Sequence, residues 1–203
     1  MQLVLIRHGE TDWNSQGRIQ GHTDTPLNAR GIAQAQQLAT RFAGEPLDAL
    51  YASPLARART TAEIIAQKIG AQVICDERLK EKGIGALEGL TADEFKQRHP
   101  DLYAAWHHST TRVELPGEES IPVFQQRIQM FLDDMCARHS HDARVALVTH
   151  GGTLGMLIAT AAGFDTSKRL PFWFDNASVS VIEIGNARPR LRLLNDRCHL
   201  NEK

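Results

Sequence analysis

Three short apolar runs, each followed closely by polar residues, restrict most strongly what this chain can fold into. The runs span residues 3–6, 49–53 and 144–149. Continuous apolar runs of this length predict strands that are buried on both faces of a sheet. Arg7 and His8 follow the first run, Arg57 lies shortly after the second, and His150 follows the third. Because ligands bind beyond the carboxyl ends of strands in open α/β sheets, we expect these side chains to converge on one crevice.

Helical segments alternate with the strands. The apolar periodicity predicts helices over residues 28–42, 60–69 and 120–138, a short strand over 72–75, and two closing antiparallel edge strands over 178–184 and 191–194. Thr91 and Glu94 form a capping box, which predicts a helix toward Pro100 and a small helical insertion at about 91–119. The alternation predicts an α/β fold with a mostly parallel central sheet. A chain of 203 residues suits one domain over 1–203.

The overall charge gives no sign of a polyanionic or lipid partner. The chain has 23 basic and 24 acidic residues, so we expect no nucleic-acid or membrane binding, and any anion site must be local. The apolar N-terminal run stops at Arg7, too short for a signal peptide, which favours a cytoplasmic location. Cys75, Cys136 and Cys198 are widely spaced and form no CxxC pair, so neither a disulfide framework nor a zinc site is expected.

Four separated motifs carry the reactive side chains. They are Arg7-His8-Gly9-Glu10-Thr11, Ser53-Pro54-Leu55-Ala56-Arg57, Glu81, and Thr149-His150-Gly151-Gly152. In this order they resemble the histidine phosphatase superfamily, in its phosphoglycerate mutase-like branch, which includes short phosphatases of the α-ribazole phosphatase type. The resemblance implies a three-layer α/β/α sandwich and a phosphohistidine intermediate at His8, with no metal or organic cofactor.

The side chains of the four motifs also indicate a reaction by their own chemistry. A neutral imidazole is a competent nucleophile toward phosphorus, which makes His8 the candidate nucleophile. Arg7 and Arg57 offer planar, charged donors that match phosphate oxygens, and His150, if protonated, adds a third cation. The same cations keep His8 unprotonated, the form that the attack requires. Glu81 matches the family's acid position, where one carboxyl group serves both half-reactions.

Further binding residues follow from the resemblance. The loop after the first motif, where the family brings donors to phosphate and substrate, supplies Asn14, Gln20, Gly21 and Thr23, and Gly151 follows His150. Each has an ordinary structural reading as well, and Asn14 can simply make a turn.

Two segments depart from the family pattern. Glu81-Lys82-Gly83-Ile84-Gly85 has aliphatic residues where many relatives have aromatic ones, which predicts a more mobile segment around the acid. Glu118 replaces a glycine of a PGGES-like motif, and we expect it to face solvent, away from a phosphate pocket.

Other candidate residues have ordinary structural readings. The histidines His107, His108, His139 and His141 lack diagnostic metal-ligand spacing and are expected at the surface. Among the tryptophans, Trp13 is the expected pocket residue because it lies between His8 and Asn14.

Three functions remain open at this point. The first is a metal-independent phosphatase for small phosphorylated metabolites, the second a phosphoglycerate mutase that moves the phosphoryl group between hydroxyls, and the third a non-catalytic phosphate sensor. The absence of room for a large lid favours hydrolysis. Sugar phosphates, phosphoglycerate, phosphoserine and α-ribazole phosphate remain candidate substrates, and a homodimer is plausible by resemblance.

Overall fold

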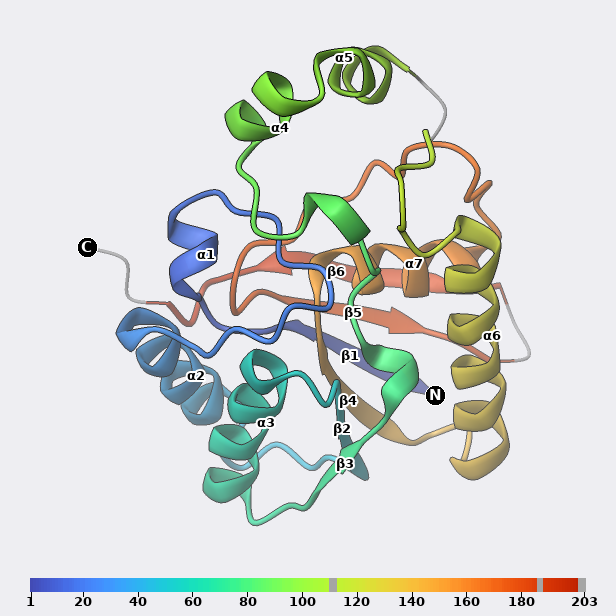
Figure 1. Ribbon diagram of the computed structural model, residues 1–203. Coiled ribbons are helices and arrows are strands. Elements are labelled where there is room, and N and C mark those ends of the chain that lie inside the picture. The colour runs from blue at the N-terminus through green and yellow to red at the C-terminus, as the bar shows by residue number, and fades with distance from the viewer. Residues whose placement is uncertain (110–112, 186–187, 201–203) are drawn as a thin grey trace.

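The computed structural model describes residues 1–109, 113–185 and 188–200, and helices and strands alternate along most of it (Figure 1). In chain order the elements are β1 (Gln2–Arg7), α1 (Asp12–Ser15), α2 (Ala29–Arg41), β2 (Ala49–Ala52), α3 (Ala56–Ile69), β3 (Val73–Cys75), the 3-10 turns η1 (Glu77–Leu79) and η2 (Gly85–Leu87), α4 (Ala92–Arg98), α5 (Pro100–His108), α6 (Ile121–Arg138), β4 (Arg144–Thr149), α7 (Gly151–Ala162), β5 (Val179–Glu183) and β6 (Arg190–Asp196).

The strands form one six-stranded sheet in the order β3-β2-β4-β1-β5-β6. The first four are parallel neighbours, whereas β5 pairs antiparallel with β1 and with β6, as the sequence predicts for the closing pair. Arg7 of β1 lies opposite Thr149 of β4, and Ala52 of β2 lies opposite Val148. The carboxyl ends of three adjacent strands therefore meet at one edge of the sheet.

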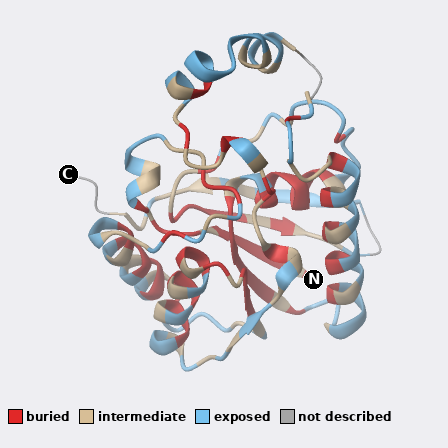
Figure 2. Cartoon of the chain, viewed as in Figure 1, coloured by how far each residue is buried: buried red, intermediate tan, exposed pale blue. Residues whose placement is uncertain are grey.

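Helices cover both faces of the sheet and complete three layers. Side chains alternate along β1, so Leu3 and Leu5 pack toward α6 and α7, whereas Val4 and Ile6 pack toward α2 and α3. Figure 2 shows the strands buried between the two helical layers, and the burial is complete for most of these side chains. The predicted mostly parallel α/β/α sandwich is confirmed.

Two local predictions need correction. Helix α7 was not predicted, because it begins with two glycines and is apolar all round, so it carries no amphipathic stripe. Helix α3 begins at Ala56, with Leu55 as its N-cap, four residues before the predicted start at residue 60, so Arg57 lies in the first turn of the helix.

The helical insertion stands apart from the sheet and has its own small core. Thr91 caps α4 in the predicted capping box with Glu94, and α5 follows directly. Leu87, Leu90 and Phe95 form a separate apolar cluster under these helices. No helix in the described residues is long and apolar enough to cross a membrane.

Candidate active site

His8 lies immediately after β1 and is almost completely buried, with 2% of its surface exposed. Its backbone N–H donates to Thr149 O at 2.9 Å, which ties it to the end of β4. Its Nδ1 lies 2.7 Å from Gly9 O. A carbonyl oxygen only accepts, so Nδ1 carries the proton and Nε2 holds a free lone pair. Burial, and then the charges of Arg57 and Arg7, lower the pKa of His8 well below its usual value, in the expected direction.

Arg57 fixes the loop that faces His8. Its Nη1 donates to Thr23 O and its Nη2 to Gly21 O, both at 2.8 Å. The side chain is 1% exposed, and burial lowers the pKa of Arg57 to about 10, so the guanidinium remains charged at neutral pH. The first turn of α3 thus presents a buried cation to the crevice.

His150 follows β4 and lies beside His8, with their ring centroids 5.2 Å apart. Its Nδ1 accepts from Arg57 Nε at 3.2 Å, so its proton is on Nε2, which donates to Ser53 Oγ at 2.8 Å. Burial, Arg57 and His8 lower the pKa of His150 well below its usual value. His150 is therefore neutral in this structure, and the third cation considered from the sequence is not formed here.

Arg7 has a buried donor that lacks a hydrogen-bond partner among the described residues and lies close to Gly151. Its Nη1 donates to Phe174 O at 2.5 Å, whereas its buried Nε has no hydrogen-bond partner among the described residues. Burial lowers the pKa of Arg7, and the nearby carboxylates of Glu81 and Asp175 act in the opposite direction. Gly151 is close to this group, since a Cβ at position 151 would lie 3.7 Å from Arg7 Nε. A buried guanidinium N–H without an acceptor suits an anion.

Glu81 is held at the N-terminus of α7. Its carboxylate accepts from the backbone N–H groups of Lys82 at 2.9 Å and of Gly152 and Thr153 at 3.0 Å. A Cβ at Gly152 would lie 2.5 Å from Glu81 Oε1, so glycine is required for this approach. Arg127 of α6 donates to Glu81 O at 2.9 Å. These contacts hold Glu81 in place, and the mobility predicted for residues 81–85 stays a prediction.

A cavity of about 330 Å³ lies among these groups. Its lining includes Arg7, His8, Arg57 and Glu81 together with Asn14, Gln20 and Gly21. His150, Gly151 and Thr23 are adjacent but do not line it. Thr23 is occupied elsewhere, because its hydroxyl donates to Glu88 Oε2 at 2.6 Å and its N–H donates to the same oxygen at 2.9 Å. A direct ligand contact from Thr23 stays a prediction.

Three further residues position the site and were not predicted from the sequence. Glu88 accepts from His22 N, Thr23 N and Ile84 N, which organises the loop that binds Arg57. Ser53 orients His150, and Arg127 anchors the Glu81 segment. Glu88 had a sequence signal, since it belongs to the Glu-Gly pair after Leu87. The only signal for Arg127 in the sequence was a charged residue between the buried Phe124 and Ile128 of α6.

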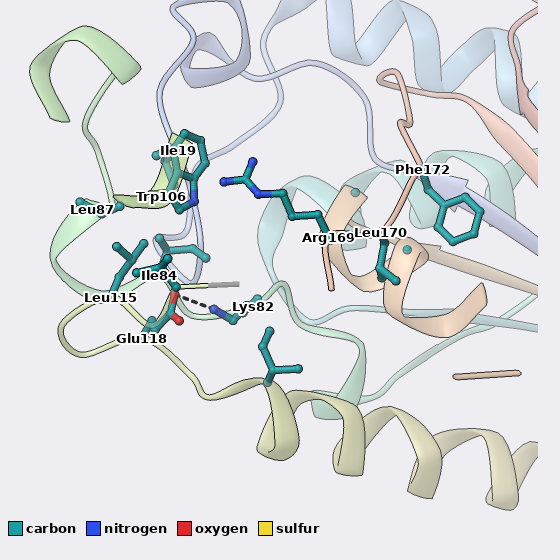
Figure 3. A pocket seen from close by; sticks show the side chains of 15 residues that line it. Ile19, Lys82, Ile84, Leu87, Trp106, Leu115, Glu118, Arg169, Leu170 and Phe172 are labelled. Carbon is teal, nitrogen blue, oxygen red and sulfur yellow. Dashed lines mark ion pairs between the residues drawn. The ribbon is translucent and has the colours of Figure 1, made fainter. Parts of the chain in front are cut away.

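A second cavity, of about 420 Å³, adjoins the first (Figure 3). The two share the lining residues Ile19, Lys82, Ile84 and Gly152. Trp106 of the insertion lines it, whereas the expected Trp13 packs against Gly89.

The expectation that Glu118 faces solvent is wrong. Its side chain is 5% exposed, and its Oε2 lies 2.6 Å from Lys82 Nζ in the wall of the second cavity. A buried amine within contact distance stabilises the inward orientation of this carboxylate.

The histidines that invited a metal reading do not form a metal site in the described residues. His107, His108 and His141 are exposed, and His139 is half-buried against Tyr51. No group of three or more His, Cys, Asp or Glu side chains suited to a metal ion occurs within residues 1–109, 113–185 and 188–200.

Comparison with known proteins identifies the family. The model of the histidine phosphatase superfamily (branch 1) matches residues 3–197. The chain belongs to the histidine phosphatase superfamily. The chain is 36% identical over 202 residues to phosphoserine phosphatase 1 of Hydrogenobacter thermophilus, covering 100% of this chain and 95% of that protein.

Other relatives of this histidine phosphatase carry different activities in their names. A protein of Escherichia coli named probable phosphoglycerate mutase GpmB is 36% identical over 189 residues, covering 90% of this chain and 85% of that one. The solved structure of a mycobacterial glucosyl-3-phosphoglycerate phosphatase in complex with VO3 has a TM-score of 0.88 at 30% identity, covering 97% and 99% of the two chains. Phosphoryl chemistry is therefore common to these relatives, whereas their substrates differ.

Proposed function

We propose that this histidine phosphatase hydrolyses small phosphate monoesters through a phosphohistidine at His8, without a metal ion. The observation that carries the proposal is the orientation of His8. Its Nδ1 proton is engaged by Gly9 O, so the Nε2 lone pair is available in a cavity that Arg7 and Arg57 also line. A buried neutral imidazole between two guanidinium groups combines a nucleophile with a charge-complementary phosphate site.

In the first half-reaction, His8 Nε2 attacks phosphorus and the bond from phosphorus to the ester oxygen breaks. Arg7 and Arg57 stabilise the charge on the non-bridging oxygens, and the unpartnered Arg7 Nε provides a ready donor. The departing oxygen takes a proton from the Glu81 carboxyl group. The bound dianion offsets the positive charges around Glu81, which allows that carboxyl group to hold the proton beforehand.

In the second half-reaction, water attacks the phosphohistidine while Glu81, now a carboxylate, accepts its proton. The nitrogen–phosphorus bond breaks, inorganic phosphate leaves, and His8 regains its lone pair. The Gly152 and Thr153 N–H groups position the side chain of Glu81 for both steps. The reaction thereby needs a single acid–base group.

The test is release of inorganic phosphate from a panel of phosphate esters by EDTA-treated protein, with conversion of 3-phosphoglycerate to 2-phosphoglycerate followed in the same samples. The proposal expects hydrolysis without isomerisation, and loss of turnover in His8→Ala. Isomerisation with little phosphate released would establish a mutase, the activity in the name of the GpmB relative. Activity lost in EDTA and restored by a divalent metal would refute the metal-independent mechanism.

A further inference from the structure

The second cavity has the chemistry of a leaving-group subsite, and its walls are mainly apolar. It adjoins the cavity that contains His8, through the shared residues Ile19, Ile84 and Lys82. An ester whose phosphate sits near His8 therefore extends its remaining part into this space. The apolar lining residues are Ile19, Ile84, Leu87, Trp106, Val113, Leu115, Ile121, Leu170 and Phe172. Apolar walls favour a leaving group that removes apolar surface from water.

Two of the three charged residues that line this subsite, Lys82 and Glu118, form an ion pair. Lys82 Nζ lies 2.6 Å from Glu118 Oε2, and these two side chains are only 9% and 5% exposed (Figure 3). Lys82 directly follows Glu81 in the sequence and lines both cavities. On its own, its ammonium group would attract a carboxylate beside the phosphate. Glu118 neutralises that attraction, so this part of the wall presents no net charge to a second anionic group.

The other cations around the two cavities support the same reading. Arg18, which lines the first cavity, forms an ion pair with Glu94 at 2.7 Å. Arg169 also lines the second cavity, but it is exposed and its Cζ lies 5.0 Å from the centre of the Trp106 ring, so solvent and salt screen its charge. Arg7 and Arg57 are the cations positioned for the phosphate itself. Among the described residues that line the second cavity, the buried cation Lys82 is paired with Glu118. A second anionic group on the substrate would therefore meet no cation there that is both buried and without an ion-pair partner.

We propose that the Lys82–Glu118 pair is a specificity determinant, which makes the second cavity accept a neutral, largely apolar leaving group and disfavours phosphate esters that carry a carboxylate. This inference rests on the proposed phosphatase function. It separates this chain's substrate class from the carboxylate-bearing compounds that appear in the names of its relatives. The selectivity arises because Glu118 makes the Lys82 cation unavailable to a carboxylate, and because the walls are apolar.

The experiment measures kcat/KM for benzyl phosphate, glycerol 3-phosphate, phosphoserine and 3-phosphoglycerate. Glycerol 3-phosphate and 3-phosphoglycerate form a matched pair, because a neutral hydroxymethyl group in one replaces the carboxylate of the other. The wild-type protein is expected to prefer benzyl phosphate and to discriminate against both carboxylate esters. Glu118→Gln is expected to raise the ratio of 3-phosphoglycerate to glycerol 3-phosphate turnover on the order of tenfold.

Three variants make the result specific to the pair. Lys82→Met combined with Glu118→Gln removes both charges, and the gain for 3-phosphoglycerate should disappear. Glu114→Gln removes an exposed carboxylate from the same segment and should leave the ratio unchanged. Glu118→Gly supplies the glycine of the family motif, and the ratio of 3-phosphoglycerate to glycerol 3-phosphate turnover should rise in it as well. This second variant keeps the inference testable if Glu118→Gln folds poorly. Circular dichroism and thermal unfolding establish that each variant is folded.

The outcomes separate the inference from the function on which it rests. A wild-type preference for 3-phosphoglycerate or phosphoserine, or an unchanged ratio in folded Glu118→Gln and Glu118→Gly, would overturn the inference and leave the phosphatase intact. Wild-type protein that releases phosphate from none of a broad panel of esters would overturn the proposed function itself.

Discussion

The two buried histidines make the stability of this protein depend strongly on pH. His8 and His150 are 2% and 1% exposed, and burial is the largest cause that lowers the pKa of each well below its usual value. Both side chains are therefore neutral when folded and take up protons on unfolding below pH 6.5. Their contribution to stability is present above that pH and is lost as the pH falls toward the folded pKa.

The magnitude follows from the unfolded histidine pKa of about 6.5. Between pH 7.5 and pH 5.0 the unfolded state gains about 2 kcal/mol per histidine relative to a folded state that stays neutral, or about 4 kcal/mol for both. Carboxylates with lowered folded pKa values, such as Glu88, lose their contribution mainly at pH values below this range. The change in the free energy of unfolding between pH 7.5 and pH 5.0 therefore reports mainly on the histidines and not on the carboxylates.

Urea unfolding at pH 7.5 and 5.0, followed by circular dichroism, measures this difference. The free energy of unfolding of the wild-type protein should fall by about 4 kcal/mol more than that of the double variant His8→Asn, His150→Asn. A matched control, His107→Asn with His108→Asn, replaces two exposed histidines and should retain the full decrease. Equal decreases in the wild-type protein and the His8, His150 variant would refute the assignment of two neutral buried imidazoles.

Three substitutions test how the site is positioned. Gly152→Ala places a Cβ 2.5 Å from Glu81 Oε1, so kcat should fall about a hundredfold in steady-state assays, and unchanged kcat would contradict the assigned role of Glu81. Glu88→Gln weakens four hydrogen bonds, which should cost about 2 kcal/mol of stability and lower vanadate affinity in isothermal titration; unaltered affinity would argue against loop positioning. Arg57→Lys should lower kcat/KM at least about a hundredfold, whereas exposed Arg59→Lys should not, and equal effects would refute a specific role for the Arg57 guanidinium.

The sheet and the position of the reactive groups could be predicted because their signals are local. The apolar runs around Val4 and Leu147 form buried strands, and a reactive histidine directly follows each strand. Helix α7 gave no such signal, since seven of its residues are buried and no polar face marks a period. The backbone N–H groups at its N-terminus nevertheless bind the Glu81 carboxylate, so this part of the site could not be predicted from the sequence.

The remaining features depend on contacts between distant residues. The orientation of Glu118 is set by Lys82, which is 36 positions away and becomes its neighbour only after folding. The protonation of His150 follows from Arg57 and Ser53, which reach it from another strand and helix. Trp106 lines the second cavity from α5 of the insertion, together with residues that are far from it in the sequence. No local pattern encodes these pairings.

The central claim, a phosphoryl group carried by His8, is tested most directly by rapid quenching during turnover. Protein mixed with a phosphate ester that it hydrolyses is stopped in base, which preserves phosphohistidine, and the peptide that contains His8 is analysed by mass spectrometry. We expect one phosphoryl group on His8 that is labile to acid, and none in the Glu81-containing or His150-containing peptides. Continued hydrolysis by His8→Ala at the wild-type rate, with no phosphorylated His8 in the wild-type protein, would contradict the account.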